Sequence, residues 1–248
     1  MRKKENCFVH VVCNVIICFV LTLVLIFSGF TRNKISEVVV GNSEYNGTIF
    51  AGDKTKKNVS LMVNVYWGTE YLVKMLDTFK EHNVKTTFFI GGTWAKDNAE
   101  LLKRIKSEGH EIASHGYSHK EHGKLSLEEN FSEIQKCHDV IKSILGINME
   151  LFAPPGGSYN KNTIKAAATL GYKTIMWSKD TIDWRDKNEN IIFNRATTNL
   201  VGGDLVLMHP TDCTAKALSD IINKIKSLKF NIVTVSENLG FSKWLNLC

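Results

Sequence analysis

Two histidines spaced four residues apart are the first candidates for chemistry in this sequence. His115 and His119 lie in the segment SHGYSH, directly after the stretch HEIA. On a helical turn, this spacing points both imidazoles the same way. Two neutral histidines with a carboxylate and a water form a familiar catalytic zinc environment. A histidine pair in a loop is often incidental, but this pair ends a predicted strand, so it is a candidate metal site.

An aspartate and another histidine follow two later strands. Asp183 lies in DTIDW, after the stretch KTIMWS, and His209 ends the stretch DLVLMH. A carboxylate beside an imidazole orients the ring and suits it to donate a proton to a leaving group. The alternative is a loop aspartate that caps a turn and a histidine that bonds to backbone. The pair is therefore a candidate proton donor with its orienting partner.

Aromatic side chains and a proline turn suggest a groove. The segment APPGGSYN is a rigid turn that contains Pro154 and offers Tyr159 for stacking on a sugar. Trp67 and Trp184 are further candidates for substrate binding, because an aromatic ring suits the apolar face of a sugar. The alternative for the turn is an ordinary strand-to-helix loop. An aromatic residue in a strand is more often core, which is our interpretation of Trp177.

Short apolar strands alternate with amphipathic helices along most of the chain. This alternation predicts a parallel β/α architecture, here an α/β fold with a deformed (β/α) barrel of about seven strands. In such folds the active site lies at the carboxyl ends of the strands, where the candidate residues fall. The predicted strands cover residues 59–65, 85–92, 110–115, 151–157, 173–178, 204–209 and 231–237. The predicted helices cover residues 70–83, 98–109, 126–146, 160–171 and 215–229.

Charge and cysteine content exclude some classes of protein. The 248 residues carry a net charge of +6, but most of the excess lies in the first 34 residues. The rest of the chain is nearly neutral, which gives no support to nucleic-acid binding. Cys137, Cys213 and Cys248 are the cysteines of the body, and their odd number and wide spacing predict no disulfide framework.

The N-terminal segment predicts membrane attachment. Residues 7–30 have no acidic or basic side chain except a histidine, and about 20 apolar residues in a helix span a bilayer core. Basic residues precede the segment, which favours a cytoplasmic N-terminus and an extracytoplasmic domain. The alternative is a long cleaved signal peptide. We predict a cytoplasmic segment 1–6, a transmembrane signal-anchor helix 7–30, a linker or stalk 31–57, a main folded domain 58–240 and a tail 241–248. Within the linker, SEVVVG and GTIFAG are either short strands or part of the stalk.

Five motifs in order resemble one known family. TTFFIGG, GHEIASHGYSH, FAPPGGSYN, MWSKDTIDW and LVLMH are similar to the polysaccharide deacetylases, the NodB-like domain of carbohydrate esterase family 4. The resemblance covers residues 59–239, and the pattern WG-x-E after the first strand resembles the sporulation-associated branch. It implies a deformed barrel that removes N-acetyl groups from chitin-like glycans or peptidoglycan.

The resemblance also implies roles for individual residues. The family holds a divalent metal, zinc or similar, with one aspartate and two histidines, and uses an aspartate base and a histidine acid. His115 and His119 match the metal histidines, and His209 matches the acid. Asp183 matches the aspartate that tunes this acid, and Trp184 matches a residue that lines the acetyl pocket.

The sequence departs from the family where the other carboxylates should be. Aligned through Trp-Gly, as in the sporulation branch, Asn64 takes the position of the base and Val65 that of the metal aspartate. Aligned on the following glycine, Tyr66 and Trp67 take these positions. The arginine that pairs with the base is replaced by Ala153. Neither alignment supplies a carboxylate, and losing base and arginine together avoids an unpaired cation.

The chemical consequence is large. General base catalysis contributes about 10²–10⁴-fold to rate, and an asparagine cannot accept a proton at neutral pH. Two imidazoles without the anionic ligand hold zinc weakly, if at all. Glu70 is a candidate substitute carboxylate; the alternative, which we prefer, is a first-turn helix acid stabilised by the helix dipole.

The expected function follows from the family and its departures. We predict a polysaccharide deacetylase-family protein that acts on N-acetylated cell-wall glycan, with weak or lost hydrolysis. The alternative is a non-catalytic, membrane-tethered glycan-binding protein in spore or cell-wall assembly. The predicted location is the extracytoplasmic side of the membrane of a Gram-positive spore-forming bacterium.

Overall fold

The computed structural model describes residues 44–45 and 47–241. The predicted membrane segment 7–30 and most of the tail 241–248 lie outside these residues. Within the described residues, no helix combines the length and apolar character needed to cross a membrane. The predicted signal anchor therefore stays a prediction.

A single curled sheet organises the described residues. Its strands follow the order β1-β2-β7-β6-β5-β4-β3-β9-β8, and β10 also pairs with β3. Every pairing is parallel except β1 with β2. The strands are β1 (Glu44–Tyr45), β2 (Thr48–Ile49), β3 (Asn58–Val65), β4 (Thr87–Ile90), β5 (Glu111–Ser114), β6 (Leu151–Phe152), β7 (Lys173–Ile175), β8 (Lys179–Asp180), β9 (Leu205–Met208) and β10 (Asn231–Ile232). The predicted parallel α/β class is thereby confirmed.

The sheet must curl because of how β7 and β8 are connected. These strands lie far apart in the strand order, yet only residues 176–178 separate them in sequence. Met176 donates its backbone N–H to Ile49 on one side of the sheet, and Ser178 donates to Leu205 on the other. Three residues therefore link β7, near one end of the strand order, to β8 at the other end, which brings the strands into a half-barrel.

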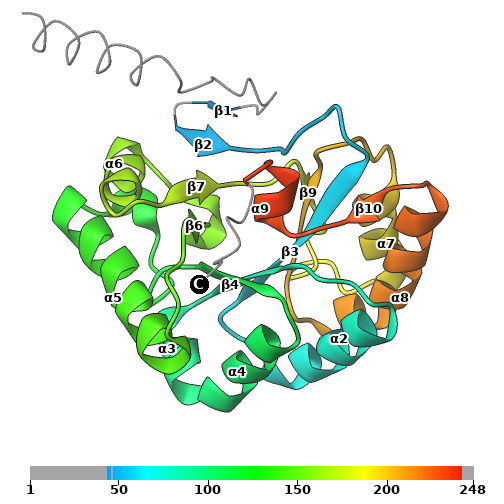
Figure 1. The fold of residues 1–248 in the computed structure, drawn as a ribbon, viewed down its shortest axis with the longest axis horizontal. Coiled ribbons are helices and arrows are strands. Elements are labelled where there is room, and N and C mark those ends of the chain that lie inside the picture. Colours follow the sequence, from blue (N-terminus) through cyan, green and yellow to red (C-terminus); the bar gives the residue numbers. More distant parts are fainter. Residues whose placement is uncertain (1–43, 46, 242–248) are drawn as a thin grey trace, which may run out of the picture. The chain divides into compact units, whose positions relative to one another are not determined.

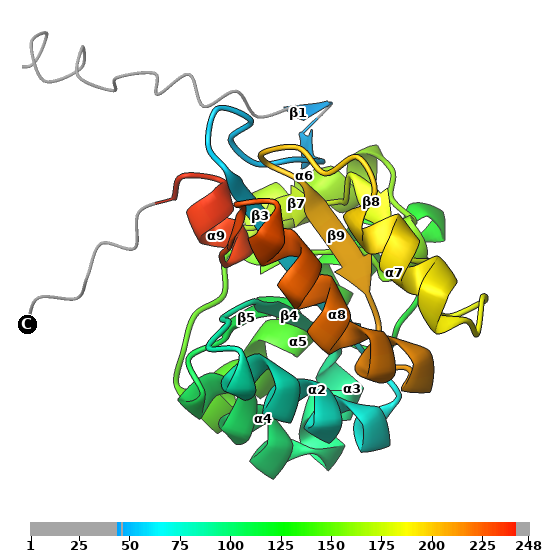
Figure 2. The same ribbon diagram turned by 90° about the vertical axis from the view of Figure 1, so that its right-hand side faces the viewer.

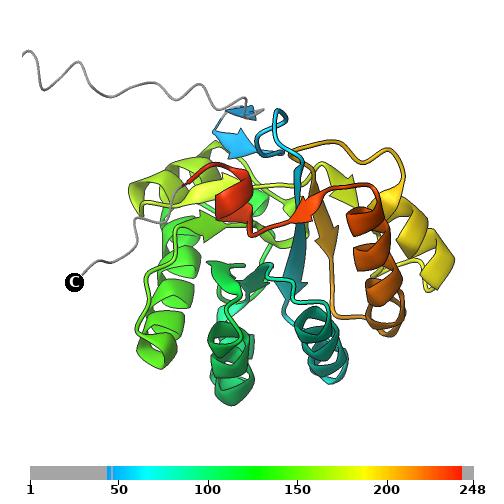
Figure 3. The ribbon, with the colours of Figure 1, turned by 45° about the vertical axis from the view of Figure 1, so that its right-hand side comes forward.

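Most helices cover the outside of this half-barrel, whereas α9 lies within the curl, where Val235 joins the inner apolar cluster (Figure 1). Helices α2, α4 and α5 lie side by side with similar axis directions (Figure 3). Helices α7 and α8 pack against one another next to β9 (Figure 2). The helices are α2 (Thr69–Glu81), α3 (Gly92–Asp97), α4 (Ala99–Ser107), α5 (Leu127–Leu145), α6 (Lys161–Thr169), α7 (Glu189–Thr197), α8 (Asp212–Ser227) and α9 (Val235–Asn238), with short 3-10 turns at His122–Lys124 and Pro155–Gly157.

Strand β3 separates two apolar layers. Its alternating residues Val63 and Val65 join the core between sheet and helices, while Met62 joins the cluster inside the curl. All three side chains are fully buried. Because β3 pairs with β4, β9 and β10, it is a central strand, and its apolar sequence reflects burial on both faces.

Some elements differ from the sequence-based expectation. Helices α3 and α7 and strand β8 were not predicted; α7 buries few residues and β8 is only Lys-Asp, so neither leaves a clear apolar pattern. The strand predicted over 231–237 was wrong beyond Ile232, because Thr234 caps helix α9 through a capping box. Part of the predicted linker belongs to the sheet, since Thr48 and Ile49 of β2 pair with β7.

Candidate functional site

His115 lies at the carboxyl end of β5, inside the protein. Its backbone N–H bonds to the carbonyl of Ile90, and its ring Nδ1 lies 2.8 Å from the carbonyl oxygen of Ala153. A carbonyl only accepts, so Nδ1 carries the proton and Nε2 keeps its lone pair. Burial and the nearby His119 lower the pKa of His115 to about 3. His115 is therefore a neutral imidazole at physiological pH, which is the state that binds metal.

His119 reaches His115 from a loop, not from the helical turn that the spacing suggested. It adopts a left-handed backbone conformation with φ of 56°, and the two ring centroids lie 5.2 Å apart. Glu133 of α5 fixes this loop: its carboxylate accepts the backbone N–H of Ser118 at 2.8 Å and the Ser118 hydroxyl at 2.9 Å. Glu133 is only 4% exposed, so the loop is tied to the interior.

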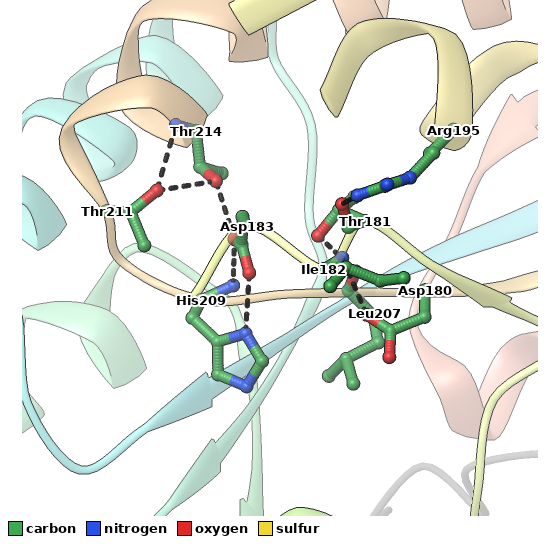
Figure 4. Close-up of polar contacts among 9 residues, drawn as sticks. All are labelled: Asp180, Thr181, Ile182, Asp183, Arg195, Leu207, His209, Thr211 and Thr214. Carbon is green, nitrogen blue, oxygen red and sulfur yellow. Dashed lines mark hydrogen bonds and ion pairs between the residues drawn. The ribbon is translucent and has the colours of Figure 1, made fainter. Parts of the chain in front are cut away.

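The predicted pair of Asp183 and His209 is present as a hydrogen-bonded unit (Figure 4). Asp183 accepts from the His209 ring Nδ1 and from the His209 backbone N–H, each at 2.7 Å. It also accepts the hydroxyl of Thr214 at 2.6 Å. The carboxylate is buried, whereas the His209 side chain is 15% exposed. The arrangement leaves Nε2 of His209 on the side of the ring away from Asp183.

The geometry at the end of strand β3 distinguishes between the two alternative alignments. Val65 is fully buried among apolar residues between sheet and helices, so its side chain does not face the histidines. Tyr66 and Trp67, just beyond the strand, do: the Tyr66 ring lies 4.8 Å from that of His119, and Trp67 stacks on His209 at 5.7 Å with 10° between planes. The assignment of Val65 to the metal-aspartate position is thus at odds with its burial. The geometry favours Tyr66 and Trp67.

Asn64 and Ala153, the other departures, are both buried. Asn64 is 4% exposed, and its Oδ1 has no hydrogen-bond partner among the described residues. Ala153 packs inside the curl, where its carbonyl oxygen accepts a hydrogen bond from Nδ1 of His115. An arginine at 153 would need a buried carboxylate partner. The alanine is therefore consistent with the loss of the first-strand carboxylates.

A glycine places Trp67 against His209. Gly68 adopts φ of 75°, and a methyl group on its Cα would overlap the backbone carbonyl of Pro210. The turn after β3 thus packs directly on the turn after β9. This close approach requires glycine, and it holds the indole over the imidazole.

The predicted substrate-binding residues differ in exposure. Trp184 is 56% exposed and Trp67 is 41% exposed, so both rings are accessible. Tyr159 is half-buried and Pro154 is buried, so the proline acts through the backbone of its turn. Trp177 packs on the core cluster inside the curl, in line with our interpretation of it as a core residue.

The residues present do not fit the metal that the family implies. Within the described part of the chain, no three acidic, histidine or cysteine side chains converge in a metal-binding group. Glu70 is exposed in the first turn of α2 and has no hydrogen-bond or ion-pair partner among the described residues. His115 and His119 supply two neutral nitrogens, and Tyr66 and Trp67, the two residues just beyond β3, supply aromatic rings and no carboxylate.

Glu133 and Thr214 are supporting residues that sequence reasoning missed. A signal for Glu133 was present: the buried face of α5 consists of Asn130, Glu133, Ile134, Cys137 and Ile141. A carboxylate in an apolar stripe must find polar partners. Thr214 had no such signal, because it looks like an ordinary residue in the first turn of α8.

Comparison with known proteins identifies the family. A family model described as polysaccharide deacetylase matches residues 51–175, which include His115 and His119. The chain belongs to the polysaccharide deacetylase family. The match ends before Asp183 and His209, so these two rest on their motifs and geometry.

Relatives in this family include characterised and uncharacterised proteins. The chain is 39% identical to the uncharacterized protein YlxY of Bacillus subtilis, over 79% of this chain and 62% of that protein. It is 32% identical to a peptidoglycan-N-acetylglucosamine deacetylase of Bacillus cereus, over 78% and 72% of the two chains. The chain therefore spans less than two thirds of YlxY.

A solved structure with the same fold is described as a pseudoenzyme. This carbohydrate esterase family 4 pseudoenzyme from Bacillus anthracis has a TM-score of 0.76 and 36% identity, over 78% of this chain and 69% of that chain. A mutant of that pseudoenzyme is described as having restored enzymatic activity, and it matches with a TM-score of 0.76 and 34% identity over 78% and 71%. The family therefore contains both enzymes and proteins without activity.

Proposed function

We propose that this protein acts on an N-acetylated cell-wall glycan and that its amide-hydrolysing activity is weak or lost. The observation that carries the proposal is the pair of aromatic contacts at the site. Rings of Tyr66 and Trp67 lie against His119 and His209, where a deacetylase needs carboxylates. The site keeps the groups that contact a leaving group and lacks those that activate water.

The retained half of the site has a coherent role. Asp183 holds the Nδ1–H of His209, so the free Nε2 can meet the amide of a bound N-acetyl sugar. His115 and His119 add neutral imidazoles, and the exposed rings of Trp67 and Trp184 offer apolar faces for sugars. Such a site binds and orients a glycan without a group able to take the proton of an attacking water.

The substrate class is supported by the relatives. The Bacillus cereus relative is named a peptidoglycan-N-acetylglucosamine deacetylase, and another at 34% identity is the peptidoglycan-N-acetylglucosamine deacetylase PgdA of Listeria monocytogenes. The pseudoenzyme of Bacillus anthracis supports the weak or absent hydrolysis. We further propose a membrane anchor through residues 7–30, an extracytoplasmic location and a role in spore formation, and that any zinc is weakly held.

Acetate release by the full chain is the deciding measurement. The substrates are acetylated chito-oligosaccharides and peptidoglycan, each with and without added zinc, and His209→Gln is the control. We expect acetate release near the level of the control, together with measurable binding of the same glycans. Metal-dependent release that disappears in His209→Gln would contradict the loss of hydrolysis, and Glu70→Gln would then test the substitute carboxylate.

Glycan binding needs its own matched control. Trp67→Ala should weaken binding, because it removes the exposed ring that stacks on His209. Phe131→Ala removes an aromatic ring of similar exposure, 39%, on α5 and should leave binding unchanged. If neither the parent protein nor either variant binds these glycans, the proposed function fails, and the protein keeps only the family fold.

A further inference from the structure

The loop that carries Asp183 contains a backbone conformation that its residue disfavours. Ile182 adopts φ of 52°, in the left-handed region. A β-branched side chain there is a genuine outlier, because its Cβ crowds the neighbouring carbonyl. Such a conformation persists only where the surrounding structure determines it strongly. The residue next to the strain is Asp183, which holds His209.

Bonds on the N-terminal side of Ile182 fix the approach to the loop (Figure 4). Thr181 is buried, and both its backbone N–H and its hydroxyl donate to the carbonyl of Leu207, at 3.1 and 2.9 Å. The N–H of Ile182 itself donates to the Asp180 side chain at 2.8 Å. The loop is thus anchored to β9 just before the strained residue.

One side chain from another element binds the loop on both sides of the strain. Arg195 of α7 donates to the carbonyl of Thr181 at 2.9 Å. The same guanidinium lies 2.6 Å from the carboxylate of Asp186. Thr181 and Asp186 flank Ile182 and Asp183, so Arg195 cross-links the two sides of the loop. Arg185 also pairs with Asp186 but is more exposed, 55% against 29%, and among the described residues no hydrogen bond joins its side chain to Thr181.

We propose that Arg195 is a positioning residue that keeps Ile182 in its left-handed conformation and thereby holds the Asp183 carboxylate on His209. A planar guanidinium suits this task because its fork of donors reaches two acceptors in fixed directions. Among the described residues, no hydrogen bond or ion pair joins Arg195 to His209, so its effect passes through the loop. The inference concerns the Asp183–His209 bond itself and does not depend on whether the protein hydrolyses a glycan.

Imidazole NMR measures that bond directly. In protein labelled with ¹⁵N-histidine, the Nδ1–H of His209 should give a low-field, protected proton resonance, assigned by its loss in His209→Gln. We expect Arg195→Met to broaden this resonance or speed its exchange with water by at least about tenfold. Arg185→Met is the matched control, since it removes only an exposed partner of Asp186, and should leave the resonance unchanged.

A double variant separates positioning from general stability. Glycine adopts the left-handed conformation without strain. Ile182→Gly with Arg195→Met should therefore recover the protected resonance, even if Arg195→Met alone folds poorly. The proposal is overturned if Arg195→Met exchanges at the parent rate, if Arg185→Met is equally affected, or if the double variant shows no recovery. If the parent protein shows the protected resonance but binds no glycan, the proposed function fails and the inference about Arg195 stands.

Discussion

At the scale of single residues, the site keeps the Asp183–His209 pair and lacks the carboxylates that the family places after the first predicted strand. Asp183 and His209 keep a two-bond pairing, while the aromatic rings of the two residues after β3 face His119 and His209. Removing a carboxylate and its arginine partner together leaves no uncompensated charge in the pocket. The described site therefore contains no unpaired buried charge at these positions, which explains how the fold tolerates the loss of both groups.

Restoring one carboxylate tests which strand position belonged to the metal. Trp67→Asp should tighten zinc binding by at least about tenfold, because an anionic oxygen would join two neutral imidazoles. Val65→Asp is the control: it buries an unpaired charge in the apolar core and should cost about 3–5 kcal/mol of folding stability without creating a zinc site. Isothermal titration with urea unfolding measures both. Tighter zinc binding by Val65→Asp, and not by Trp67→Asp, would reinstate the alignment through Trp-Gly.

At the scale of elements, the sequence predicted strand ends better than loops. The apolar runs around β3, β4, β5 and β9 placed His115 and His209 correctly, because parallel strands end at one edge of the sheet. The conformations of the connecting loops were not predictable. The left-handed His119 and Ile182 depend on the bonds of Glu133 and Arg195, which come from distant helices. The apolar face of α5 indicates that Glu133 needs polar partners, but the local sequence does not say which loop supplies them, and Arg195 carries no such signal.

The turn after β3 offers a test at this scale. Gly68 and Gly146 both have positive φ, but a methyl group at 68 would meet Pro210, whereas one at 146 would meet nothing within 4 Å. Gly146→Ala should cost about 1–2 kcal/mol from backbone strain alone. Gly68→Ala should cost about 1–3 kcal/mol more, because the turns after β3 and β9 must separate. Urea unfolding compares the two. Equal losses would show that the contact with Pro210 contributes nothing to stability.

At the scale of the whole molecule, buried histidines make folding sensitive to acid. His110, the residue before β5, is 2% exposed, and its ring packs edge-on against the rings of Phe79 and Phe88. Burial, followed by the charge of Lys85, lowers the pKa of His110 from 6.5 to about 4. The folded protein therefore binds this proton only near pH 4, while the unfolded chain binds it near pH 6.5. Between these values the unfolded state holds more protons, so stability falls as the pH drops.

The difference in the pH dependence of unfolding between the parent and a His110 variant isolates this group. Between about pH 7.5 and about pH 5, His110 should contribute a loss of up to about 2 kcal/mol in the free energy of unfolding. His110→Gln keeps an acceptor for the backbone N–H of Thr86 but cannot titrate. The variant should therefore lose less stability over this range than the parent, while the loss from buried His115 remains in both. Identical pH profiles in urea unfolding would mean that His110 gains its proton without unfolding, through an opening of the Phe79–Phe88 cluster that the packed structure does not show.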